Sequence, residues 1–399
     1  MAGMAAAGDP NGVSAEPNGV SAEPNEPREV TAEGVIAVEM PDPALTALAA
    51  ATNVPAFAYR LTYRHSERID CNSWEMYPLY FASEPNHPER EPDAAFLREQ
   101  LSLGPEEMNL DKLAAYLEAC SAKLALLEQA VRCRGNAWPK IRDTSEPEPE
   151  DPMFFGLGDP PARPEQPELK IADVPTLLAQ LDAAGLLLSA KARYHIARGE
   201  YDEACRWLRT GLAQGRQMTD DTDAILALAG AVNVGRVLRQ VEMWVERPGS
   251  PSLFRALGDL PRPLIGFSGV REKDRYSDQV WQEPYDILEA EPAFLKASPR
   301  IVQAIERLAA ALQCVEAIRL HAALNAGRFP ASLGEITDVR VPLDPVTRQA
   351  FGYSLDGGVM TLTAEKTESG SRLEFRYRVL REQNPDFHGM PGMDMMMMF

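Results

Sequence analysis

The sequence has few histidines, few aromatic residues and none of the familiar catalytic motifs. Only 5 of its 399 residues are histidine, and 7% are aromatic. It contains no HExxH, GxSxG or GxGxxG motif and no Walker loop, so nothing indicates a zincin, a motif-bearing serine hydrolase or a dinucleotide-binding fold. From the sequence we therefore assign no catalytic residue, no metal-binding residue and no cofactor.

Cysteines and long apolar runs are also scarce. The five cysteines are scattered without a CxxC pair, which argues against a disulfide framework or a zinc site. We expect buried free thiols, and a bridge between Cys120 and Cys133 or between Cys71 and Cys133 stays open. No apolar run is long enough to cross a bilayer, so we expect no transmembrane segment. The N-terminus lacks a secretory signal, which favours the cytoplasm, but the location stays open.

Basic residues are outnumbered by acidic ones, 40 to 59, giving a formal net charge of −19. Residues 1–40 carry a net charge of −6 and residues 143–168 one of −7, so these two segments hold most of the excess. This sign disfavours a nucleic-acid partner. Both segments are rich in proline, and residues 10–27 repeat the heptad PNGVSAE. We predict a disordered acidic arm over residues 1–43 and an acidic, proline-rich linker over 143–170.

The chain ends in a methionine-rich stretch, with six methionines and His388 among its last 13 residues. Thioether and imidazole groups suit Cu(I), so soft-metal binding is one hypothesis for this tail. Because nothing holds these side chains in place, we favour a disordered tail over residues 382–399.

Residues 44–142 predict an N-terminal helical region. It comprises a short helix within residues 44–58, a strand-like stretch at Tyr59–Tyr63 and an aromatic helix or turn at Asn72–Phe81. A longer helix follows, capped by Asn109 or Asp111 and ending near Gly135, because its apolar residues recur at helical spacing. They are Leu113, Tyr116, Leu117, Cys120, Leu124, Leu127 and Val131.

Residues 171–300 predict helical hairpins, with helices at Val174–Ala197, Asp202–Met218 and Thr222–Val245. Gly199 separates the first two, and Pro248-Gly249 ends the third. The segment from Gly199 to Leu208 resembles the second half of a tetratricopeptide repeat, which implies a peptide-binding hairpin. His195 and Gly211 depart from that pattern, and no second copy occurs, so we favour a helical hairpin with generic packing and keep the peptide-binding array as the alternative.

Residues 301–381 predict a long helix followed by a small β module. Ser298-Pro299 is a typical helix start, and Gly327 should end this helix near Ala326 with a positive φ. Strands are expected at Phe351–Leu355, Val359–Ala364 and Leu373–Leu380, with a hairpin turn at Asp356–Gly358.

Three short patterns in residues 315–355 resemble a segment of large, uncharacterised planctomycete protein families. They are Gly327-Arg328-Phe329-Pro330-Ala331-Ser332-Leu333, Val341-Pro342-Leu343-Asp344-Pro345 and Phe351-Gly352-Tyr353. The layout is also similar to the soluble part of type II secretion pseudopilins, without their hydrophobic N-terminal helix. The chain departs at Thr347-Arg348, where those relatives tend to have glycine second. The resemblance implies a fold element and a cell-envelope context, but no activity.

The sequence thus predicts a mainly α-helical protein with a small C-terminal antiparallel β module and disordered ends. Our leading hypothesis is a non-enzymatic scaffold that docks a protein partner on the hairpins of residues 174–245. The alternative is an enzyme or small-ligand binder with a pocket between helical layers, lined by Trp74–Phe81 and Arg193 or Arg206.

Cys314 and His321 stand two helical turns, about 10 Å, apart, too far for a nucleophile–base pair. We interpret the carboxylate pairs Asp220/Asp221 and Glu289/Glu291 as solvated or helix-capping groups.

Overall fold

The structure is a computed structural model that describes part of the chain. The described residues are 46–47, 50, 58–81, 93–104, 106–136, 138, 140–142, 168–170, 173–219, 224–247, 249–266, 291–365 and 373–379. They belong to the second of two compact units, Met1–Ala37 and Val38–Phe399. The predicted acidic arm, methionine-rich tail and most of the linker lie outside the described residues.

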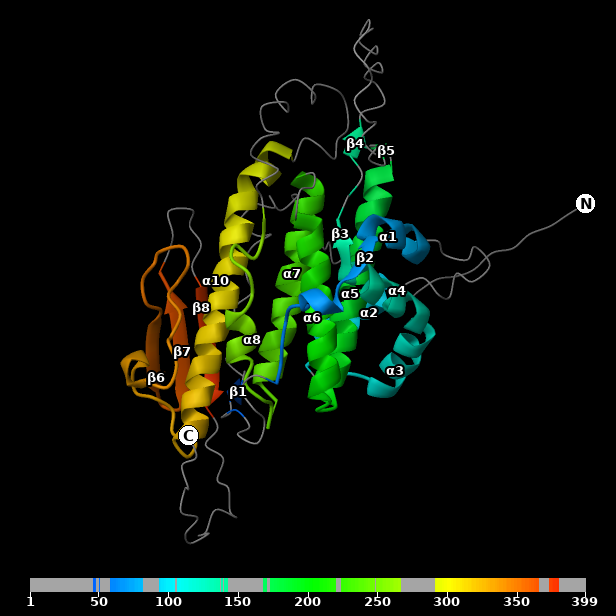
Figure 1. Cartoon of the computed structure of the whole chain (residues 1–399). Coiled ribbons are helices and arrows are strands. Elements are labelled where there is room, and N and C mark those ends of the chain that lie inside the picture. The colour runs from blue at the N-terminus through cyan, green and yellow to red at the C-terminus, as the bar shows by residue number, and fades with distance from the viewer. Residues whose placement is uncertain are drawn as a thin grey trace, which may run out of the picture. The chain divides into compact units, whose positions relative to one another are not determined.

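The described part is mainly helical, with a small antiparallel sheet near the C-terminus, and this confirms the predicted fold class (Figure 1). Its helices are α1 (Ser73–Phe81), α2 (Ala94–Ser102), α3 (Leu110–Ala119), α4 (Ser121–Arg132), α5 (Val174–Ala197), α6 (Tyr201–Thr219), α7 (Ala224–Val245), α8 (Phe254–Gly258) and α10 (Glu291–Leu324). Its strands are β1 (Thr46–Ala47), β2 (Ile69–Asn72), β3 (Cys133–Gly135), β4 (Lys140–Arg142), β5 (Glu168–Lys170), β6 (Gly352–Asp356), β7 (Val359–Ala364) and β8 (Leu373–Val379).

The helices α5, α6 and α7 each contact the other two. Gly199 has a φ of 70° and ends α5, where the Glu200 amide donates to the His195 carbonyl at 2.9 Å, as the sequence predicted. A Cβ on Gly230 would lie only 2.4 Å from the backbone oxygen of Gly215. Glycine at that crossing therefore lets α6 and α7 approach closely.

The N-terminal helices pack on this group, α2 and α3 against α5 and α4 against α6. Asn109 caps α3 by accepting a hydrogen bond from the Lys112 amide at 3.0 Å, as predicted. The single helix expected to run to Gly135 is wrong, because the chain turns at Cys120 and divides it into α3 and α4. The apolar spacing continues across the turn, so the sequence pattern does not reveal it.

The strand predicted at Tyr59–Tyr63 is wrong, because this segment is irregular and pairs with no described strand. Its odd-numbered side chains, Tyr59, Leu61 and Tyr63, are buried against helices. Tyr59 packs edge-on against Trp244 with ring centroids 5.4 Å apart, and the Tyr63 hydroxyl contacts the Thr210 hydroxyl at 2.9 Å. The helix predicted within residues 44–58 is wrong at Thr46–Ala47, which is strand β1.

The helix α10 contacts α7 on one side and strands β7 and β8 on another (Figure 1). It begins at Glu291, so the predicted start at Ser298-Pro299 is wrong. A proline removes one amide donor, but the residues before it can still be helical. Gly327, with a φ of 77°, follows the helix end as predicted, and its amide donates to the Ala322 carbonyl at 2.8 Å.

The C-terminal sheet has the order β1-β8-β7-β6. The pairs β6–β7 and β7–β8 are antiparallel, whereas β1 adds in parallel to β8. Gly357 and Gly358 have φ values of 55° and 81°, so the predicted hairpin turn is confirmed. The residues Met360, Leu362, Phe375 and Tyr377 form the buried face of this sheet.

Two cysteines form a disulfide, and three are free. Cys71 of β2 is bonded to Cys133 of β3, so the expectation of free thiols is wrong for this pair, one of the two bridges left open. Cys120, Cys205 and Cys314 are buried free thiols, as expected. None of the described helices combines the length and apolarity that crossing a membrane requires.

Candidate functional site

A cavity whose lining includes four arginines lies beside α6. A recess of about 220 Å³ is formed there between α6 and the segment of residues 58–67. We call it the arginine recess, and its lining residues are Ala58, Tyr59, Arg60, Arg64, Glu67, Asp202, Cys205, Arg206 and Arg209. Four arginines and two carboxylates line the recess, and Glu128 and Glu203 also pair with Arg206, so the guanidinium groups without an ion-pair partner are those of Arg60 and Arg64.

Local structure explains why these arginines converge. On α6, Asp202, Cys205, Arg206 and Arg209 recur at helical spacing and therefore share one face. In the extended segment, the buried odd-numbered side chains leave Arg60 and Arg64 on the outward side. The disulfide and the pairing of β2 with β3 hold the far end of this segment.

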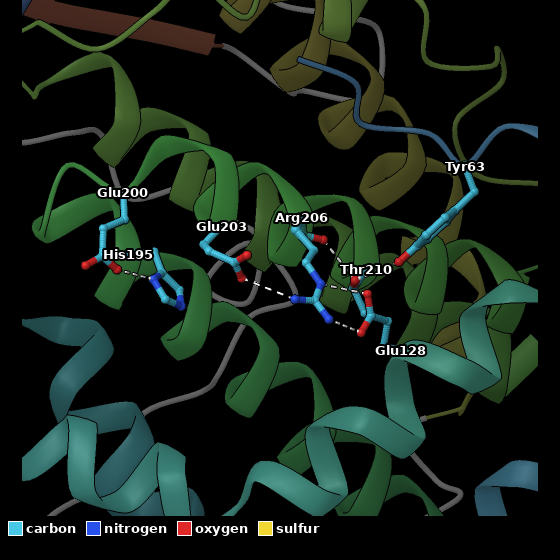
Figure 2. A network of polar contacts seen from close by, with 7 residues as sticks. All are labelled: Tyr63, Glu128, His195, Glu200, Glu203, Arg206 and Thr210. Carbon is cyan, nitrogen blue, oxygen red and sulfur yellow. Dashed lines mark hydrogen bonds and ion pairs between the residues drawn. The ribbon is translucent and has the colours of Figure 1, made fainter. Parts of the chain in front are cut away.

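Two of the four arginines are fixed by neighbours. The Arg206 guanidinium donates from Nε to Oε1 of Glu128 at 2.7 Å and also contacts the second oxygen of that carboxylate and Glu203 (Figure 2). Arg209 pairs with Glu67 at 3.0 Å and lies over the Tyr63 ring, 4.2 Å from its centroid. These contacts hold both guanidinium groups at the recess before any ligand arrives.

The other two arginines are open to a ligand. The side chains of Arg60 and Arg64 are exposed, and within the described part of the chain neither has a hydrogen-bond or ion-pair partner. The Arg60 carbonyl accepts a hydrogen bond from the Cys205 thiol at 3.3 Å, so its backbone is anchored while its guanidinium is not. An anionic group in the recess would therefore meet two prepositioned and two adaptable cations.

The neutral and acidic groups of the recess are not poised for proton transfer near neutral pH. Burial raises the pKa of the Cys205 thiol to about 11 and that of Tyr59 to about 12, so both stay protonated. Burial also acts to raise the pKa of Glu67, but the Arg64 amide and Arg209 outweigh it and lower that pKa, so the carboxylate stays charged. Because their protonation states are fixed near neutral pH, Cys205, Tyr59 and Glu67 are suited to binding a ligand.

His195 and Glu200 form a separate polar contact at the turn between α5 and α6 (Figure 2). Burial lowers the pKa of His195, so its ring is neutral at pH 7 and donates from Nδ1 to Oε2 of Glu200 at 2.7 Å. Glu200 also accepts from Arg198 at 2.7 Å. This contact closes the hairpin turn, which gives His195 a structural place where the repeat pattern has an aromatic residue.

The structure brings one of the predicted pocket residues, Arg206, into a cavity. Arg193 is buried instead, where it donates to Gln240 at 2.7 Å and to the carbonyls of Leu101 and Leu103. The aromatic segment Trp74–Phe81 packs on itself and on Trp138, with Tyr77 and Trp138 centroids 4.9 Å apart.

Cys314 and His321 make no hydrogen bond with each other. Cys314 is fully buried, and His321 contacts Asn325 and, at 3.5 Å, Asp338. The pair Asp220/Asp221 and the side chains of Glu289/Glu291 lie outside the described residues. In the part of the chain that the structure describes, no three His, Cys, Asp or Glu side chains are grouped so that they could hold a metal ion.

The sequence reasoning missed Arg60, Arg64 and Arg209. The available signal was weak: Arg60 and Arg64 share the outward side of an alternating segment, and Arg206 and Arg209 share a helix face. Nothing in the sequence places those two pairs together across more than 140 positions.

Comparison with known proteins identifies no relative of this chain. The chain matches no protein-family model, and neither the curated proteins nor the solved structures show significant similarity to it. The resemblance of residues 315–355 to planctomycete families therefore stays a prediction.

Proposed function

We propose that this protein is a non-enzymatic binding protein that docks a partner protein on the hairpin region of residues 174–245. The arginine recess receives a carboxylate or phosphate group carried by that partner. The observation that carries the proposal is the pair Arg60 and Arg64, which line the recess and whose guanidinium groups make no hydrogen bond or ion pair among the described residues. The resemblance of Gly199–Leu208 to part of a tetratricopeptide repeat, which implies a peptide-binding hairpin, supports docking on this same surface.

The size of the recess favours an anionic group on a larger body. Sites that enclose a small molecule usually measure roughly 300–1,000 Å³ and are mostly apolar. The arginine recess, at about 220 Å³, is smaller and is lined largely by charged residues. It can hold one anionic group, while the rest of the ligand stays outside against the helices.

Binding of this kind should depend strongly on salt. Exposed ion pairs contribute only about 0.2–1 kcal/mol each, but prepositioned arginines can pair with carboxylate or phosphate in a bidentate manner. Because Arg206 and Arg209 are already held by Glu128 and Glu67, part of the ordering cost is met before binding. We expect moderate affinity and an association rate that falls as ionic strength rises.

The test uses the full chain and two fluorescein-labelled probes, a hexaglutamate peptide and a peptide with one phosphoserine between alanines. The variant Arg60→Glu/Arg64→Glu reverses two charges at the recess. Arg134→Glu/Arg328→Glu changes the net charge equally at exposed positions away from it. Fluorescence anisotropy at low salt measures the affinity of each protein for each probe, and circular dichroism checks folding.

We expect at least one probe to bind the native chain and to bind the recess variant at least about tenfold more weakly, with little change in the control. The stronger probe then identifies carboxylate or phosphate as the preferred group. Binding of neither probe, or equal weakening in the two charge-reversed proteins, would show that the proposal is wrong.

A further inference from the structure

A second and larger cavity lies between α8, α10 and the loop of residues 338–348. We call it the loop cleft, and its volume is about 1140 Å³. Phe254, Val302 and Ala310 contribute apolar surface from the helices, and Val341, Leu343 and Val346 contribute it from the loop. None of these residues lines the arginine recess, so the two cavities are built from different parts of the chain.

The loop wall is held in place from beneath by a buried ion pair. Arg307 of α10 contacts Asp344 at 2.8 Å, and the two side chains are 0% and 2% exposed. The Asp344 carboxylate also accepts from the Val346 amide and the Thr347 hydroxyl, each at 3.0 Å. The loop is therefore formed in advance of any ligand, which lowers the ordering cost of binding.

This rigid loop displays an apolar side chain to solvent. Leu343 is 49% exposed although Pro342 precedes it and Asp344 anchors the next position. Leu343 also lines the cleft, so a ligand bound there would cover apolar surface that now contacts water.

Two arginines of the same loop lack partners. Arg340 and Arg348 are exposed and line the cleft, and within the described residues neither side chain makes a hydrogen bond or ion pair. Four acids line the cleft, Asp259, Glu306, Asp338 and Asp344. Glu306 accepts from Arg262 at 2.7 Å and from the backbone amides of Leu264 and Ile265, Asp344 is paired with Arg307, and Asp338 contacts His321 at 3.5 Å. Among the charges at the cleft, these arginines are thus available to an anion.

The backbone conformation at Arg348 supports a binding role for its side chain. Its φ is 61°, in the left-handed region where glycine is favoured and other residues are strained. The Arg348 amide closes the turn on the Asp344 carbonyl at 2.8 Å, a bond that glycine would make equally well. The Arg348 side chain makes no hydrogen bond or ion pair with the described residues. The strained backbone at this position therefore points to a role of the side chain in binding.

We propose that the loop cleft binds an organic anion with an elongated apolar body. The body lies against Leu343, Val341 and the facing apolar residues of α8 and α10, and the anionic group pairs with Arg340 and Arg348. The cleft exceeds the roughly 300–1,000 Å³ of most small-molecule sites, so the body is larger than a single ring. This site is independent of the proposed protein-docking function, because it uses other residues and another class of ligand.

The test uses the full chain and 8-anilinonaphthalene-1-sulfonate, an aromatic anion that fluoresces when it binds apolar surface. Dodecanoate serves as an anionic competitor, and dodecyltrimethylammonium has the same apolar chain with the opposite charge. The variants are Arg340→Gln, Arg348→Gly and Leu343→Asp, with Arg328→Gln as the matched control outside the cleft. Melting temperatures are measured for every variant.

We expect saturable binding at one site, displacement by dodecanoate and much weaker displacement by the cation. Arg340→Gln and Arg348→Gly should each weaken binding about tenfold, whereas Arg328→Gln should not. Arg348→Gly is the decisive variant, because relief of the positive φ should raise its melting temperature while its affinity falls. The proposal is overturned if the native chain shows no saturable binding, if the cation displaces as well as the anion, or if the cleft variants bind like the control.

Discussion

Glu246 should make the stability of this protein fall as the pH rises from about 4.5 to about 8. The residue directly follows α7, and its Oε1 atom is buried without a hydrogen-bond partner among the described residues. Burial and, to a lesser extent, the nearby Glu242 carboxylate raise its pKa to about 8, with Arg193 opposing both. Glu242 is itself buried, and Tyr377 of β8 faces the same two carboxyl groups.

The sign of the effect follows from where the proton is held more tightly. An unfolded glutamate titrates near pH 4.5, whereas Glu246 in the folded protein titrates near pH 8. The stabilising contribution of the bound proton is complete below pH 4.5 and is lost as the pH rises through 8. A shift of this size corresponds to at most roughly 5 kcal/mol, since each pKa unit is worth about 1.4 kcal/mol.

The variant Glu246→Gln tests this reasoning, because glutamine keeps the shape of the protonated side chain and cannot ionise. Urea denaturation at intervals between pH 6 and pH 9 gives the free energy of unfolding of the native chain, of Glu246→Gln and of the exposed control Glu99→Gln. Glu246→Gln should gain about 2–4 kcal/mol over the native chain at pH 9 and progressively less toward pH 6. A difference that does not grow with pH, or equal behaviour of Glu99→Gln, would refute the buried-carboxyl argument.

Three further predictions concern the framework of the fold. Arg307→Met should lower the free energy of unfolding by about 3–5 kcal/mol, because it leaves Asp344 buried and unpaired, and adding Asp344→Leu should recover much of the loss in chemical denaturation. Replacing Cys71 and Cys133 by serine opens a loop spanned by a sequence separation of 62 and should cost about 4 kcal/mol, measured against the unreduced native chain. Gly230→Ala should destabilise by more than about 2 kcal/mol, because its Cβ would meet the facing helix backbone; an unchanged melting temperature would contradict the close crossing.

Local chemistry made several features of the fold predictable. Gly199 and Gly327 end helices with a positive φ, and Gly357-Gly358 forms the turn of a hairpin, because glycine adopts these conformations without strain. Asn109 is a helix cap for an equally local reason, since its side chain reaches an amide three residues on.

Other features depend on packing that no local pattern records. The apolar stripe of residues 113–131 continues through Cys120, although neighbouring helices require a turn there. Tyr59, Leu61 and Tyr63 alternate like a strand, yet their buried side meets helices and finds no strand to pair with. The disulfide was open between two pairings, because sequence spacing does not fix which cysteines meet.

By itself, the sequence determined the helical class, the helix ends marked by Gly199 and Gly327 and the C-terminal hairpin, because these follow from periodicity and from the backbone freedom of glycine. Only the tertiary structure decided the candidate sites. Arg60 and Arg64 meet Arg206 and Arg209 because an extended segment packs along α6. Arg340, Leu343 and Arg348 face α8 and α10 because Arg307 holds Asp344 beneath their loop. Such convergence depends on long-range packing and buried charge pairing, which spacing along the chain does not encode.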